Sequence, residues 1–492
     1  MRLAASQQMM WEFMTALDPA HPGNSRLVVV EFRRLLGDLD VAVLDAAVGD
    51  VIARHDALRM RFARIGADPA VEILPEVASP LEHHDVSDLP PDERRRWVER
   101  LVHAHRTRAF DPCAAPLWRA ALVRLSPGEH VLALTCFHMV SDGWSCQLFM
   151  ADVVHAYAAR LGIRPPQPPL PAGLHRFAGI VALQDALAGD PDRAAYWRDR
   201  LRPLPGGYQL FPAGKPGPAD DLSAEVPDRF AFPAEVAGGL RGVARRARTS
   251  PYIALLAAWQ VLLALRSGRR RIVLGTTTLG RDTAPERELF GQFTNNVYVP
   301  ADVDPDRPLL DVVAAAHAET RAAMAHVAAF HTVAAAVDPD FDRHRPWPDN
   351  HLFDGWFQSA APAAPTIELP GLVVEPVDIT ARPAPDAPAP VVASDVPPEC
   401  LPVWVKRGSP IVVVDDDRAG GVIIRNRSFF GDDLVAGLVA DYQAVVATLV
   451  TAPGTPVGRV RLPDGASFGS AYPGYRTGNT SGGCHRHGRD AG

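Results

Sequence analysis

The sequence predicts two domains that each combine helices with strands, and three observations support this. The chain has 492 residues, which is long for a single compact core. Runs that alternate like half-buried strands are followed by stretches in which apolar residues recur at helical spacing. A proline-rich segment from Arg164 to Pro171 can neither continue a helix nor enter a central strand. We expect this segment to link the two domains.

The elements follow from apolar spacing and from the residues that flank each run. Helical spacing begins at Val41, and Ser250 followed by Pro251 is typical of a helix start. Pro203 to Asp221 and Phe353 to Trp356 are expected to be loops. We expect helices near 6–11, 41–58, 149–157, 194–201, 252–265 and 434–450, and strands near 71–74, 117–123, 131–137, 272–279, 403–405, 411–414 and 422–424.

The stretch from His138 to Ser145, with the sequence HMVSDGWS, is the most informative part of the chain. It lies between an alternating run and a helical one, so it predicts a strand-to-helix turn. Gly143 would permit a backbone conformation that other residues resist, and a helix N-terminus offers unpaired N–H groups. Such a turn can hold an imidazole and an acid in a fixed relation, which suits acyl transfer. The same residues could also be a strand-end histidine, a capping Asp142 and a turn glycine.

This stretch resembles the HHxxxDG signature of the condensation domains of nonribosomal peptide synthetases, a superfamily that includes the carnitine and chloramphenicol acyltransferases. The second histidine of the signature, the catalytic one in the family, falls on His138, and its Asp and Gly fall on Asp142 and Gly143. Phe137 stands where the family has its first histidine. If the strand continues to His138, Phe137 faces the opposite side, so we expect its ring to replace that histidine as a packing residue.

Other stretches resemble further motifs of this family and favour membership over a chance match. Ser6 to Trp11 resembles the first motif weakly, with Ser6 as a helix cap, and Arg54 to Arg59 closely resembles RHExLR. His55 lies on the apolar face of its helix, so we expect a buried, hydrogen-bonded structural histidine. Leu289 to Asn296 closely resembles GxFVNT, about 150 residues after the central motif as in the family.

The resemblance implies an α/β fold of the α+β sandwich type. Two chloramphenicol-acetyltransferase-like lobes would form a V-shaped pseudo-dimer with a central substrate tunnel and His138 near its middle. We expect an N-terminal lobe with the HxxxDG motif over 1–163, a proline-rich linker at 164–172, a C-terminal lobe over 173–463 and a disordered tail at 464–492. The resemblance covers roughly residues 3–453 without an adenylation or carrier domain, as expected for a free-standing condensation enzyme.

The resemblance also implies a reaction. An acyltransferase of this kind joins an acyl or aminoacyl thioester, bound to a carrier protein, to an amine or hydroxyl nucleophile and forms an amide or ester in natural-product biosynthesis. The substrate would arrive on a phosphopantetheine arm, with no tightly bound cofactor. His138 would act as general base, a contribution of about 10²–10⁴-fold, and Gly143 would let backbone N–H groups approach the oxyanion. The expected partners are an acyl or peptidyl carrier protein and a small-molecule nucleophile.

The remaining candidate residues surround the expected tunnel. Asp142, grouped with His138 and Gly143 as catalytic, could equally point away from the substrate, and the resemblance implies a salt bridge from it to Arg281. We expect that an Asp–Arg pair in a poorly hydrated place is geometrically specific. The residues expected to bind substrate or support the tunnel are Trp144, Ser145, Arg281, Gly291, Asn295 and Asn296.

Two alternatives stay open beside the condensation enzyme. One is an acyl-CoA-dependent O-acyltransferase of the same superfamily. The other is a non-catalytic docking or recruitment module, which the Phe137 replacement favours and the intact Asp142 and Gly143 disfavour. Epimerisation fits this motif set less well, and heterocyclisation would replace the histidine with Asp. The donor, the acceptor, the choice of carrier or CoA, and the oligomeric state are left open.

Composition excludes several other classes. The net charge is −7 and no block of like charges occurs, so neither nucleic acid nor an anionic membrane surface is expected as a partner. Five scattered cysteines without a C-x-x-C pair argue against a disulfide framework and a metal site. The N-terminus lacks a signal-peptide core, and the longest apolar stretch, Tyr252 to Leu265, is too short to span a bilayer. We expect a cytoplasmic protein.

Overall fold

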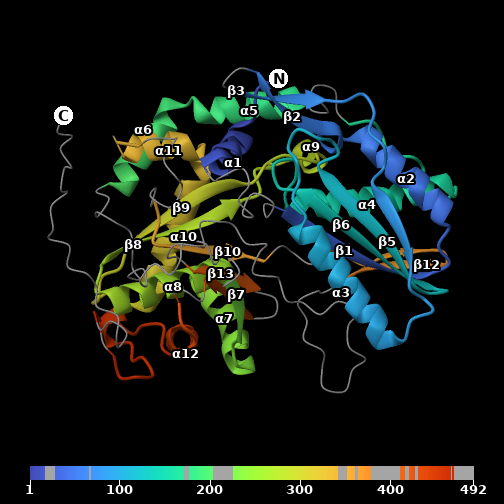
Figure 1. Ribbon diagram of the computed structural model, residues 1–492. Helices are drawn as coiled ribbons and strands as arrows, with labels where there is room; N and C mark the ends of the chain where they lie inside the picture. The colour runs from blue at the N-terminus through green and yellow to red at the C-terminus, as the bar shows by residue number, and fades with distance from the viewer. Residues whose placement is uncertain are drawn as a thin grey trace, which may run out of the picture.

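Two six-stranded sheets, each with its own helices, form two lobes that lie side by side (Figure 1). The strand orders are β11-β12-β1-β6-β5-β4 in the first sheet and β7-β14-β13-β10-β8-β9 in the second. The computed structural model describes residues 1–16, 28–65, 68–170, 177–202, 225–338, 340–341, 352–360, 364–377, 410–415, 420–426, 430–466 and 468–469. The predicted strand at 403–405 lies outside these residues.

The first lobe is built mainly from the N-terminal third of the chain. Its elements are α1 (Ala5–Ala16), β1 (Val28–Gly37), α2 (Val41–Arg54), the 3₁₀ helix η2 (Asp56–Arg59), β2 (Met60–Ile65), β3 (Asp68–Ile73), β4 (Leu81–Asp85), α3 (Pro91–Thr107), β5 (Trp118–Ser126), β6 (Glu129–Phe137) and α4 (Gly143–Arg160). Strands β2 and β3 form a separate hairpin.

The second lobe contains most of the remaining elements, but α5 packs Ile180 and Val181 into the core of the first lobe, and two strands join the first sheet. The elements after α4 are α5 (Phe177–Ala188), α6 (Pro191–Leu201), β7 (Glu225–Ala231), α7 (Ala234–Arg246), α8 (Pro251–Ser267), β8 (Arg271–Thr278), α9 (Ala284–Arg287), β9 (Asn295–Asp302), α10 (Leu309–Ala325), α11 (Phe330–Val337), β10 (Gly355–Ser359), β11 (Ile367–Leu369), β12 (Leu372–Pro376), β13 (Ile411–Asp415), β14 (Gly420–Asn426), α12 (Asp432–Thr451) and the 3₁₀ helix η7 (Val457–Arg459).

Strand β6 shows how alternation builds the first lobe. Leu132 and Leu134 belong to the core that includes residues of α2 and α4, whereas Val131 and Ala133 pack with residues of α3. Successive side chains on a strand point to opposite faces, so α2 and α4 cover one face of the sheet and α3 covers the other.

Helix α8 is the central helix of the second lobe and confirms the predicted buried helix. Ser250 caps it by accepting a hydrogen bond from the Ile253 N–H, Pro251 occupies its first turn, and Gly268 ends it at φ 69°. Every residue from 253 to 266 is buried. Helix α12 has the length and apolar composition of a membrane span, yet it packs through Leu438 into the second core beside α7 and α8.

The lobes do not divide as the expected boundary at the proline-rich segment implies. Strands β11 and β12 belong to the range 173–463, but β12 pairs with β1 and thereby extends the first sheet (Figure 1). Gly355 and Trp356, expected in a loop, begin the central strand β10. The expected tail starts within the described residues, where Asp464 binds Arg266 and the Gly469 N–H donates to the Leu265 carbonyl.

Candidate active site

The predicted strand-to-helix turn is present between β6 and α4. Strand β6 ends at Phe137 and α4 begins at Gly143. The Phe137 carbonyl accepts hydrogen bonds from the Val140 N–H and the Ser141 hydroxyl, which closes the turn. The residues between the two elements are therefore held tightly although they belong to neither.

His138 has one ring nitrogen engaged and one available. Its Nδ1 lies 2.8 Å from the carbonyl oxygen of Ser141. A carbonyl can only accept, so Nδ1 carries the proton in the neutral ring and the lone pair lies on Nε2. The side chain is half-buried. This arrangement gives an oriented imidazole whose basic nitrogen is not used by the turn.

Phe137 is a packing residue. It is fully buried, and its ring lies 5.7 Å from that of Phe110. Its N–H donates to the Leu117 carbonyl. Because β6 ends at Phe137, the alternation argument does not extend to His138, which lies in the turn. The ring at position 137 nevertheless fills a closed apolar site.

Asp142 caps the N-terminus of α4. Its backbone is extended (φ −138°, ψ 179°), and its Oδ1 accepts from the Ser145 N–H at 2.8 Å. The residue has no exposed surface. Its carboxylate also accepts from the Phe293 N–H at 3.0 Å, so the second lobe contributes to this cap.

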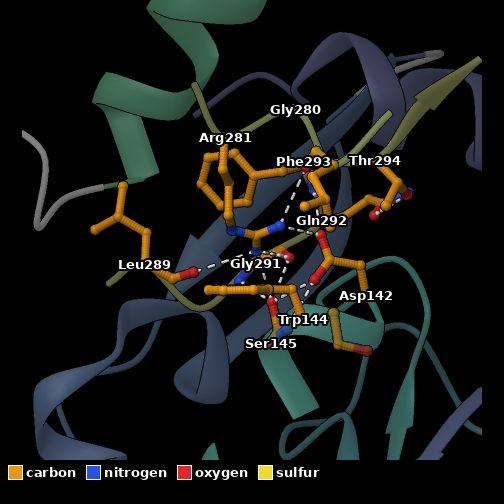
Figure 2. A network of polar contacts seen from close by, with 12 residues as sticks. Asp142, Trp144, Ser145, Gly280, Arg281, Leu289, Gly291, Gln292, Phe293 and Thr294 are labelled. Atoms are coloured by element: carbon orange, nitrogen blue, oxygen red, sulfur yellow. Dashed lines mark hydrogen bonds and ion pairs between the residues drawn. The ribbon is translucent and has the colours of Figure 1, made fainter. Parts of the chain in front are cut away.

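Arg281 reaches the same carboxylate from the second lobe, as expected. Its Nη1 lies 2.6 Å from Oδ2 of Asp142, and both side chains are fully buried. Figure 2 shows the guanidinium group of Arg281 facing the carboxylate of Asp142. The pair does not form two parallel hydrogen bonds, because Nη2 donates to the Ser145 hydroxyl at 2.8 Å. Asp142, Ser145 and Arg281 therefore form one closed polar network across the two lobes.

Ser145 is the central member of this network. Its Oγ accepts from Arg281 Nη2 and from the Gly291 N–H at 3.0 Å. Its single proton can go to Asp142 Oδ1 at 2.8 Å or to the Gly291 carbonyl at 2.7 Å. One hydroxyl thus connects the first turn of α4 to the segment after α9.

Gly280 allows the turn that brings Arg281 to the network. Its φ is +64°, and a Cβ there would lie 2.0 Å from the carbonyl oxygen of Phe293. The Arg281 guanidinium carbon lies 4.1 Å from the centre of the Phe293 ring. Only glycine fits this position, because both the backbone angle and the close approach exclude a side chain.

Gly143 does not have the special backbone conformation that we expected. Its φ is not positive, and it is the first residue of α4. A Cβ at this position would meet no atom within 4 Å. The expectation of conformational freedom is therefore wrong, and the glycine instead leaves open space in front of the helix N-terminus.

Of the other predicted residues, Gly291 joins the network through its backbone, whereas Trp144, Asn295 and Asn296 make their described hydrogen bonds outside it. Trp144 donates from Nε1 to the Arg287 carbonyl of α9 at 2.8 Å. Gly291 contributes its backbone to Ser145. Asn295 and Asn296 begin β9, where the Asn295 side-chain oxygen accepts from the Asn296 N–H.

Helix α1 also connects the lobes, through hydrogen bonds of Ser6 and Gln7 that were not predicted from the sequence. Gln7, which is buried, donates from Nε2 to the Met139 carbonyl at 2.8 Å. Ser6 is not a cap but lies within α1, where its hydroxyl contacts Gln184 and the Gln292 carbonyl. A polar Gln184 on the apolar helix α5 was the one available signal.

His55 is confirmed as a buried, hydrogen-bonded histidine. Its Nε2 lies 2.7 Å from Asp152, whose other oxygen accepts from Gln167 at 2.6 Å. Gln167 belongs to the proline-rich segment, in which the Pro168 carbonyl also accepts a hydrogen bond from Arg54.

A cavity of about 810 Å³ lies between this segment and helices α2 and α4, and none of its lining residues is a predicted site residue. The described part of the chain holds no cluster of three or more His, Cys, Asp or Glu side chains suited to a metal.

Comparison with known proteins agrees with the fold and the motifs. The family model "Condensation domain" matches residues 1–330. The chain is 33% identical over 313 residues, 63% of its length, to phosphinothricin tripeptide synthetase PhsB of Streptomyces viridochromogenes. It is 26% identical over 471 residues, 94% of its length, to chondramide synthase cmdD of Chondromyces crocatus. These matches span 26% and 11% of the two relatives.

Solved structures cover nearly the whole chain. The SgcC5 protein of Streptomyces globisporus, solved with (R)-(−)-1-(2-naphthyl)-1,2-ethanediol and sucrose, has 27% identity and a TM-score of 0.73 over 93% of this chain and 100% of its own. The X-domain from teicoplanin biosynthesis has 22% identity and a TM-score of 0.71 over 94% of this chain and 97% of its own, a likeness of fold alone. The fold is the two-lobed, chloramphenicol-acetyltransferase-like one, and the chain belongs to the condensation-domain family of nonribosomal peptide synthetases.

Proposed function

We propose that the chain is an acyltransferase that joins a carrier-bound acyl or aminoacyl thioester to an amine or hydroxyl nucleophile. The observation that carries this proposal is the orientation of His138, whose Nδ1 donates to the Ser141 carbonyl and leaves Nε2 basic. Nε2 takes the proton of the nucleophile as the new C–N or C–O bond forms. The C–S bond then breaks, and the thiol of the phosphopantetheine arm leaves with a proton.

The N-terminus of α4 is the proposed site of oxyanion stabilisation. In the first turn of α4, the Asp142 side chain accepts a hydrogen bond only from the Ser145 N–H. The N–H groups of Gly143 and Trp144 therefore stay available to stabilise the tetrahedral intermediate. The open space at Gly143 would admit the thioester carbonyl. Asp142 is buried and fully hydrogen-bonded, so its proposed role is to hold the turn through Arg281 and not to accept a proton.

The bond formed can be an amide or an ester. Condensation domains of peptide synthetases form amide bonds, which supports an amine acceptor. The SgcC5 protein was solved with a naphthyl ethanediol, and this supports a hydroxyl acceptor as the alternative. A CoA thioester is a second possible donor, with the same leaving thiol group. We infer a cytoplasmic location, in keeping with relatives that are biosynthetic synthetases.

Mass spectrometry tests the proposal directly. A holo-carrier loaded with an acyl group is incubated with the protein and with candidate amines and alcohols, and the acylated product and the freed thiol are both measured. The same acyl group on CoA tests the alternative donor. We expect transfer by the wild type and none by His138→Ala, with a melting temperature only slightly lowered, because the variant loses a single hydrogen bond made by a half-buried ring. Near-normal turnover by the variant would refute the assignment of His138 as base.

A non-catalytic recruitment module is the second candidate. The teicoplanin X-domain, similar in fold, was solved in complex with OxyB, and Phe137 departs from the family signature. This candidate predicts no product with any donor and a stable complex with a partner enzyme. The intact hydrogen bonding of His138 favours the enzyme.

A further inference from the structure

Four buried polar side chains meet where α1 contacts both lobes. They are Ser6 and Gln7 on α1, Gln184 on α5 and Gln292 in the segment between α9 and β9, and none is more than 9% exposed. Side chains of these types lie mostly on protein surfaces, so a buried group of four requires an explanation. We call Ser6, Gln7, Gln184 and Gln292 the α1 polar cluster.

Gln7 uses both ends of its side-chain amide. Its Oε1 accepts from the Ala4 N–H at 3.2 Å, and its Nε2 donates to the Met139 carbonyl at 2.8 Å. The N–H can only donate and the carbonyl can only accept, so this orientation of the amide is the one that satisfies both. The bond to Ala4 caps the start of α1, a task that a glutamate performs equally well. Only the bond to Met139 requires a glutamine.

The Met139 carbonyl belongs to a peptide unit that is held at both ends. The same unit carries the Val140 N–H, which donates to the Phe137 carbonyl at 3.0 Å. A peptide unit is planar, so hydrogen bonds to Gln7 on one side and to Phe137 on the other fix its rotation. Met139 is fully buried, and without Gln7 the peptide would rotate toward another donor, because a buried carbonyl without a hydrogen bond is unfavourable.

This peptide unit lies between His138 and the carbonyl that orients its ring. Nδ1 of His138 donates to the Ser141 carbonyl at 2.8 Å, and the chain reaches Ser141 through the unit that starts at Met139. A rotation of the unit displaces the Ser141 carbonyl. The imidazole would then lose the partner that keeps its proton on Nδ1 and its lone pair on Nε2.

Ser6 engages a second peptide unit in the same manner. The Gln292 carbonyl lies 3.2 Å from the Ser6 hydroxyl and 3.3 Å from Nε2 of Gln184. The same unit carries the Phe293 N–H, which donates to the Asp142 carboxylate at 3.0 Å. Consecutive residues of α1 therefore hold one peptide unit inside the turn after β6 and another that binds the aspartate at the end of this turn.

We propose that Gln7 is a positioning residue for acyl transfer. From α1 it fixes the peptide unit between Met139 and Val140, and through this unit it keeps the imidazole of His138 in the Nδ1–H tautomer. Gln7 acts through the turn and does not itself touch the reacting atoms. This inference rests on the proposed function, in which His138 is the base.

A purely structural role for Gln7 is the alternative, and Gln260 provides a matched control. Gln260 on α8 is also fully buried, and its Nε2 donates to the Val299 carbonyl at 3.0 Å in the core of the second lobe. Gln7→Met and Gln260→Met each remove one amide donor from a buried backbone carbonyl with little change in volume. Both variants should melt below the wild type, but only Gln7→Met loses a bond to the turn that carries His138.

Steady-state kinetics of acyl transfer separate the two roles. We expect the kcat of Gln7→Met to fall about 10- to 100-fold with KM within about twofold of the wild type, because a misplaced base slows the reaction without weakening substrate binding. The kcat of Gln260→Met should stay within about twofold of the wild type. A wild-type kcat in Gln7→Met, or an equal fall in Gln260→Met, would overturn the proposal.

Gln7→Glu serves as a second variant if Gln7→Met yields too little soluble protein. The new carboxyl group has the same length and still accepts from the Ala4 N–H, but once ionised it has no proton for the Met139 carbonyl. Burial raises the pKa of such a group, so the ratio of its kcat to that of the wild type should fall between about pH 6 and pH 9. A ratio that is constant over this range would overturn the proposal.

The tautomer of His138 tests the inference without requiring turnover. Nitrogen NMR of protein with isotopically labelled histidines reports the tautomer at a pH where the ring is neutral, and His138→Ala identifies the signals of this residue. We expect the Nδ1–H form in the wild type and in Gln260→Met, and a mixture of both tautomers in Gln7→Met. The same tautomer in all three proteins would overturn the proposal. If the wild type transfers no acyl group, the proposed function fails, and this spectrum still decides whether Gln7 positions His138.

Discussion

Arg281 of the second lobe places its Nη1 2.6 Å from the carboxylate of Asp142 in the first lobe, with both side chains fully buried. Removal of one partner leaves a buried charge unpaired, at a cost of about 3–5 kcal/mol. We expect Asp142→Ala and Arg281→Ala each to lower the free energy of unfolding by this amount. The double variant should lose less than the sum of the two, and urea denaturation measures all three. Strictly additive losses, or stable single variants without turnover, would assign Asp142 to the chemistry.

Ser145→Ala should weaken the same network without removing a charge. The change leaves the Gly291 N–H without its acceptor, whereas Arg281 Nη2 keeps the carbonyls of Leu289 and Gly291, and we expect a loss of about 1–3 kcal/mol in unfolding free energy. Ser87→Ala is the matched control, because the Ser87 hydroxyl also binds an aspartate, Asp85, but on the exposed surface. An equal, small loss in both variants would show that the buried hydroxyl adds nothing.

Two glycine substitutions should have opposite consequences. Gly280→Ala forces a side chain into a left-handed backbone and against the Phe293 carbonyl, so we expect a lower melting temperature and little soluble protein. Gly143→Ala meets open space on a helix, so the melting temperature should be kept or rise slightly. Acyl transfer by Gly143→Ala should nevertheless fall, because the methyl group occupies the proposed carbonyl position. Full activity would place the substrate elsewhere.

Phe137→His should not increase turnover, although it restores the family signature. The position is closed and apolar, with the Phe110 ring 5.7 Å away, so an imidazole there lacks a hydrogen-bond partner among the described neighbours. Phe137→Ala should lower the unfolding free energy by about 3–5 kcal/mol through the cavity that it leaves. An inert wild type that gains activity with Phe137→His would support the recruitment module.

Asp354 should make the free energy of unfolding depend on pH. Burial raises the pKa of this carboxyl group to about 6, against 3.8 when unfolded, and Arg269 only partly opposes the shift. The folded state therefore holds the proton more tightly, so this stabilisation is complete below pH 3.8 and is lost as the pH rises through 6. The loss is about 3 kcal/mol.

Comparison with Asp354→Asn isolates this term from other carboxylates. Asparagine cannot ionise but can still accept from the Val273 N–H, as Asp354 does at 2.7 Å. We expect the unfolding free energy of the wild type to fall relative to the variant between about pH 4 and pH 7.5. A difference that stays constant over this range would contradict the raised pKa.

The candidate site could be predicted where its signal is local. The turn between β6 and α4 follows from the change of hydrophobic period around His138, and the resemblance supplied Arg281 as the partner of Asp142. The role of Gly143 was predicted wrongly. The sequence shows that this position has no side chain, but it does not show whether the reason is a special backbone conformation or the open space beside the residue.

Interactions between distant segments could not be predicted. The hydroxyl of Ser145 binds Gly291, 146 residues away, and Gln7 binds the Met139 carbonyl, 132 residues away. Serine and glutamine occur mostly on surfaces, so nothing in their types marks them as buried network members. Strands β11 and β12 have three and five residues, too short for a period to indicate which sheet they join.

The pairing of β12 with β1 sets a limit on how the first lobe can be made. Arg34 on β1 and Glu375 on β12 are 341 residues apart. At ribosomal rates of about 5–20 residues per second, β1 waits roughly 20–70 s for its neighbour. During that time its backbone N–H and C=O groups form an open edge that other chains can pair with. Synthesis of this protein therefore includes a period in which the half-built chain is exposed to aggregation, and chaperone supply during translation should control its yield.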